Sequence, residues 1–94
     1  MAGSATLQDL ASQLNDVTDQ LIVLVGQISI ENSEIAALQS LIFQYQSAGM
    51  QDLANQATDK LNSIVSQKQS DITAKNALVL QRQTLDVALE TFFQ

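Results

Sequence analysis

The stretch that decides the fold is residues 7–45, LQDLASQLNDVTDQLIVLVGQISIENSEIAALQSLIFQY. Apolar residues recur in it at alternating steps of three and four, which places them on one face of an α-helix. The positions of this seam are Leu7, Leu10, Leu14, Val17, Leu21, Leu24, Ile28, Glu31, Ile35, Leu38, Ile42 and Tyr45. Only Glu31 breaks the apolar pattern. The stretch therefore predicts one long helix over about 6–48, with Thr6 as its N-cap.

A glycine follows this seam and indicates where the first helix ends. Gly49 can adopt the left-handed backbone conformation of a helix C-cap because it has no Cβ. Met50 is then expected to fold back onto Tyr45, as in a Schellman motif. We expect a short turn at about 49–51 and a second helix at about 52–93, with Asp52 near its start.

The second half of the chain carries a matching apolar stripe. Its members recur at steps of three, four or seven, and they are Leu53, Ala57, Leu61, Ile64, Ile72, Leu78, Leu85, Leu89 and Phe92. Two long helices joined by a short turn pack as antiparallel neighbours. The sequence thus predicts a single all-α domain over 1–94, a coiled-coil-like antiparallel two-helix hairpin that assembles into a bundle or larger oligomer.

The one polar seam residue predicts a register. If the chain reverses at Gly49, opposed residues have numbers that add to about 99, and Glu31 faces Lys68. A Glu31–Lys68 pair would disfavour a hairpin that had slipped by one heptad, as a single polar seam residue does in coiled coils. In the alternative interpretation, both long side chains extend to water.

The first helix also carries apolar residues away from its seam. They are Ile22, Val23, Val25, Ile30 and Phe43, with Gly26 among them and Phe93 near the C-terminus. One hairpin cannot cover both faces of a helix, so these residues predict an interface with other chains. Gly26 is either a close crossing point with a neighbouring helix or a tolerated surface glycine.

Composition excludes several classes of function. The chain contains no histidine and no cysteine, which removes the commonest general base, the usual zinc ligands and the thiol nucleophile. A net charge of −6 disfavours nucleic acid as a partner. We therefore expect no catalytic site, no metal, no cofactor and no small-molecule substrate.

Nothing in the sequence identifies a cellular compartment. No secretory signal peptide is visible at the start. The strongest apolar run, residues 21–25, is far shorter than the roughly 20 residues that span a bilayer. We expect a soluble chain without stable membrane insertion.

The leading functional hypothesis is a structural subunit that binds itself or other proteins within a larger assembly, such as a virion or a secretion apparatus. One alternative is a helical adaptor or chaperone that binds a client helix. A weaker alternative is a secreted, membrane-active hairpin that uses residues 21–30 as an interfacial segment.

Overall fold

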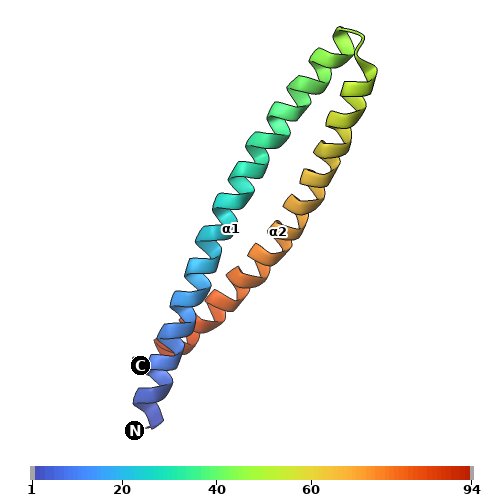
Figure 1. Cartoon of the computed structure of the whole chain (residues 1–94). Coiled ribbons are helices and arrows are strands. Elements are labelled where there is room, and N and C mark those ends of the chain that lie inside the picture. The colour runs from blue at the N-terminus through green and yellow to red at the C-terminus, as the bar shows by residue number, and fades with distance from the viewer. Residues whose placement is uncertain (1, 94) are drawn as a thin grey trace. The chain divides into compact units, whose positions relative to one another are not determined.

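The structure is a computed structural model that describes residues 2–93, with the side chains of residues 6–93. It contains two helices, α1 (Ala2–Ser47) and α2 (Gln51–Phe92), which pack as a hairpin. Figure 1 shows the two helices joined by one short turn. No strand occurs within residues 2–93. The predicted all-α helical hairpin is confirmed.

The start of α1 differs from the prediction. The helix begins at Ala2, so Thr6 lies inside it and is not its N-cap. Alanines at positions 2 and 5 and the absence of proline allow the helix to extend by one turn beyond the apolar seam. The other helix bounds lie within one residue of those predicted, Ser47 for the end of α1 and Gln51 to Phe92 for α2.

The turn has the hydrogen bonds of a Schellman motif. Gly49 has a φ of 75°, in the left-handed region that glycine adopts without a Cβ penalty. The Met50 amide donates to the Tyr45 carbonyl at 2.8 Å, and the Gly49 amide donates to the Gln46 carbonyl at 3.1 Å. The predicted return of Met50 to Tyr45 is thus present in the backbone.

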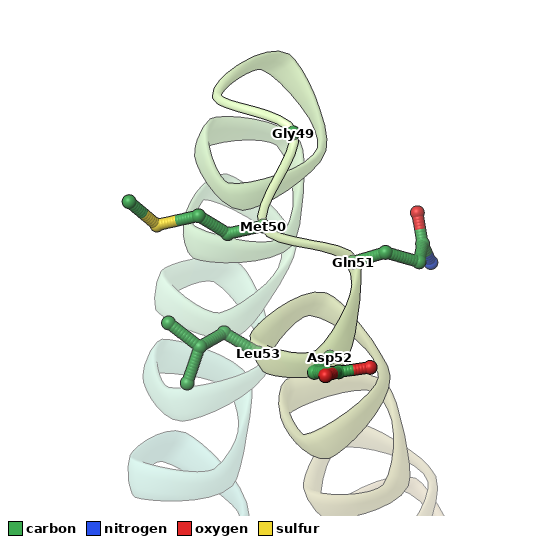
Figure 2. Close-up of a pocket in the computed structure, with 5 residues that line it drawn as sticks. All are labelled: Gly49, Met50, Gln51, Asp52 and Leu53. Atoms are coloured by element: carbon green, nitrogen blue, oxygen red, sulfur yellow. The ribbon is translucent and has the colours of Figure 1, made fainter.

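Met50 also opens the second helix. Its carbonyl accepts the first hydrogen bond of α2, from the Ala54 amide at 3.0 Å. Asp52 follows in the first turn of α2, where a negative charge favours the helix dipole. A shallow depression at this tip is lined by residues 49–53 (Figure 2), and Gln51 points away from the α1 side while Met50 lies on it. Since α1 ends at Ser47 and α2 begins at Gln51, the link between the helices is three residues long.

Contacts within the chain divide it into two compact units, where the sequence predicts one domain. The first unit, termed the open-end unit, contains residues 1–25 and 73–94. Its core consists of Val17, Leu21 and Leu85, with Leu10, Leu14 and Leu78 packed against them. Every residue of this core is a branched aliphatic, as the seam pattern predicts.

The second unit, termed the turn unit, contains residues 26–72. Its buried side chains are small or charged: Ala54, Ala57, Glu31 and Asp71. Half-buried Thr58 beside these alanines donates its hydroxyl to the Ala54 carbonyl at 2.8 Å. The hydroxyl is thereby satisfied within its own helix and needs no partner from α1.

Candidate interaction surface

Five large apolar side chains of α1 are more than half exposed, and we term them the outer α1 face. Its members are Ile22, Val23, Val25, Ile30 and Phe43, with Phe43 at 70% exposure. All five belong to the set that the sequence predicts as an interface. Their exposure leaves them available to another molecule.

The spacing of the outer α1 face follows the helical repeat. Val23 and Ile30 are seven residues apart, and Ile22 and Phe43 are separated by three such steps. Ala36 and Ala37 lie between them and are also exposed. Residues at seven-residue steps share a helix face, so the apolar character continues along α1 over residues 22–43.

Gly26 is exposed on α1 and approaches no other part of the described chain. A Cβ built on it meets no heavy atom within 4 Å. The hairpin itself therefore does not require glycine here, and the predicted close crossing has no partner among residues 6–93. Ser33 and Ser40 follow at seven-residue steps and are exposed as well, so this flank of α1 is lined by small residues.

Phe93 lies directly after the end of α2 and is 77% exposed. The other residues of the predicted interface belong to α1. Four exposed apolar residues of α2 lie outside the predicted stripe and were missed from the sequence: Val65, Val79, Leu80 and Val87. The signal for two of them was available, since Leu80 and Val87 are seven residues apart. They line a shallow depression with Gln83 and Thr84. Leu53 and Phe92, which the sequence places in that stripe, are each 41% exposed.

Glu31 is buried, as a seam position requires, and a second carboxyl group lies beside it. The side chain is 2% exposed, and neither of its carboxylate oxygens has a hydrogen-bond partner. No hydrogen bond from Lys68 reaches Glu31, and the expected Glu31–Lys68 contact stays a prediction. The adjacent carboxyl group is that of Asp71, which is 9% exposed and lies three residues beyond Lys68 on α2.

Glu31 and Asp71 place two buried carboxyl groups side by side, and we term this pair the carboxyl layer. Burial raises the pKa of Glu31 above its usual value of 4.5, and the adjacent Asp71 carboxyl raises it further. The Gln27 side-chain amide lowers the pKa of Glu31, and the negative charge of Glu34 raises it by a smaller amount.

Asp71 is held by one hydrogen bond from its own helix. The Gln67 side-chain amide donates to Asp71 Oδ1 at 3.1 Å. Asp71 Oδ2 is buried and has no partner. Three of the four carboxylate oxygens in this layer thus lack a donor, which is costly for ionised groups.

One described helix, α1 over Thr6–Ser47, is long and apolar enough to cross a membrane by length and composition alone. Only 11% of its most apolar window is buried within the chain. The prediction considered only the uninterrupted run at residues 21–25 and so did not register the whole helix. A core helix of a soluble protein meets the same two criteria, so this finding is weak evidence for a membrane span.

The described residues contain no group of three or more acidic, histidine or cysteine side chains that could hold a metal ion. Comparison with protein-family models, with curated proteins and with solved structures gives no match to this chain.

Proposed function

We propose that this chain is a non-catalytic structural subunit that associates with further copies of itself through the outer α1 face. The observation that carries the proposal is the exposure of Ile22, Val23, Val25, Ile30 and Phe43 on a single helix. Contiguous exposed apolar residues on a folded chain are typical of protein interfaces. Association would remove this surface from water, which is favourable by about 25 cal/mol per Å² of apolar area.

The total exposed area supports the same proposal. The chain exposes 6484 Å². A compact monomer of 10.2 kDa is expected to expose about 5,300 Å². The excess, roughly 1,200 Å², is larger than the roughly 800 Å² that each partner buries in a standard protein interface. One further copy could cover a large part of this excess.

The test is the mass of the chain in solution as a function of concentration. We expect the unmodified chain to form a multimer in light scattering and analytical ultracentrifugation. The combined variant Val23→Ser, Ile30→Ser and Phe43→Ser should retain its helical circular dichroism and dissociate. Removal of three interface side chains at about 1 kcal/mol or more each weakens association by roughly 100-fold or more.

A matched control uses exposed apolar residues of the other helix. The variant Leu80→Ser and Val87→Ser removes two side chains of similar exposure from α2. We expect this variant to retain the multimer. A chain that is monomeric at all concentrations would contradict self-association. It would favour the alternative in which the outer α1 face binds a helix of a client protein.

A second candidate is a membrane-associated hairpin, which the length and composition of α1 favour. The apolar outer α1 face would then lie against acyl chains. Flotation with neutral phosphatidylcholine vesicles tests this candidate, because the net charge of −6 disfavours anionic lipid. Flotation of the chain, lost in the Val23, Ile30 and Phe43 variant, would support the membrane candidate; failure to float would remove it.

A further inference from the structure

The carboxyl layer of the turn unit is a second feature, separate from the outer α1 face. Glu31 of α1 and Asp71 of α2 are both at least nine-tenths buried and lie beside each other. Glu31 Oε1, Glu31 Oε2 and Asp71 Oδ2 have no donor. Two adjacent ionised carboxylates without donors would repel each other where water is excluded.

The basic residues that flank Asp71 on α2 form no hydrogen bond with Glu31. Lys68 and Lys75 lie three residues before and four residues after Asp71 on α2, and both are half-buried. Neither donates a hydrogen bond to a Glu31 oxygen. On α1, Glu34 lies one turn further along and adds negative charge. With no basic donor bonded to Glu31, a proton is the ligand that would remove one of the two like charges.

We propose that Glu31 and Asp71 form a proton-binding site in which the two carboxyl groups share a single proton in the folded hairpin. The proton comes from solvent and is held as an O–H of Glu31 that donates to Asp71 Oδ2. Gln67 leaves this oxygen free because its amide is bound to Asp71 Oδ1. One proton thus supplies a donor, satisfies a buried acceptor and removes one of two like charges.

A shared proton makes the folded chain less stable as the pH rises, whereas a salt-bridged acid makes a fold more stable as the pH rises. The pKa of Glu31 is raised in the folded chain, so protonation favours the fold. The stabilisation is complete below pH 4.5, the usual pKa of a glutamate in the unfolded chain. It is lost as the pH rises through the pKa of Glu31 in the folded chain. Between those two values the unfolding constant rises by up to about tenfold per pH unit for one proton.

The direct test is a titration of individual carboxyl carbons by NMR on chain labelled with ¹³C at glutamate and aspartate. We expect the Glu31 midpoint to be higher in the folded chain than in the same chain unfolded in urea. Asp71→Asn should lower that midpoint, because the amide carries no charge and can donate to Glu31. Glu34→Gln should lower it by less, since Glu34 is the smaller of the two influences.

Urea unfolding between pH 4 and pH 8 gives the second readout. Glu31→Gln should flatten the fall in stability with rising pH, because the amide cannot bind the proton. A Glu31 midpoint in the folded chain at or below that of the unfolded chain would overturn the proposal. The NMR midpoint reports protonation of Glu31 and not the mass of the chain, so this proposal and the proposed function can fail separately.

Discussion

The open-end unit and the turn unit fill the same helical seam with different chemistry. The open-end unit buries Val17, Leu21 and Leu85, all aliphatic. The turn unit buries two alanines and two carboxyl groups, and all of its large apolar side chains are half-buried or exposed. The difference corresponds to the distance of each unit from the turn along the chain.

Loop closure explains why the turn unit tolerates small and charged seam residues. Contacts close to the turn join segments that are already near each other in sequence, so they cost little chain entropy. Contacts of the open-end unit close a longer loop, up to the full length of both helices. They need greater burial of apolar surface to offset that cost.

The largest expected effect comes from the open-end unit. Leu85→Ala should lower the free energy of unfolding by about 2–4 kcal/mol, because it leaves a cavity beside Val17 and Leu21. Urea unfolding followed by far-UV circular dichroism measures the change. The matched control is Leu80→Ala on the same helix, where the leucine is 65% exposed. The Leu80→Ala variant should lose less than about 1 kcal/mol of unfolding free energy. Equal losses in the two variants would contradict the difference between seam and surface positions.

The next largest effect is expected at the turn between the helices. Gly49→Ala should lower the free energy of unfolding by about 1–2 kcal/mol, because alanine is strained at a φ of 75°. No heavy atom lies within 4 Å of the added Cβ, so the loss is conformational and not steric. Differential scanning calorimetry at fixed protein concentration measures it.

Gly26→Ala is the matched substitution, with the opposite sign. Gly26 lies in the interior of α1 with open space around it. Alanine is the better helix former by about 0.5–1 kcal/mol, so the variant should be more stable than the unmodified chain. A destabilised Gly26→Ala variant would point to a close contact that only an assembled form makes.

The smallest expected effect lies at the start of α2. Asp52→Asn removes a negative charge from the first turn and should cost about 0.3–1 kcal/mol at low ionic strength. The loss should shrink as salt is added, because the charge is exposed. Asp59→Asn, two turns further along, should change stability by less than about 0.5 kcal/mol. Chemical denaturation at low and high salt separates the two, and a salt-independent loss at Asp52 would argue against the dipole.

Prediction from the sequence was accurate for the two helices and their turn. The alternating seam indicated both helices, and Gly49 with Met50 indicated the Schellman turn. The predicted start of α1 was wrong because a capping residue is only a weak stop when the preceding residues can also be helical. The position of Asp71 beside Glu31 was missed because the pattern along one helix does not fix which side chains of the other helix lie next to it.

The sequence by itself determined the two helices, their turn and the surplus of apolar residues on α1, because these depend on spacing and on backbone preferences along one chain. Only the tertiary structure decided that Asp71 lies beside Glu31 and that the outer α1 face is exposed. The first depends on which side chains of α2 lie opposite α1, and the second on which side of α1 is covered by α2.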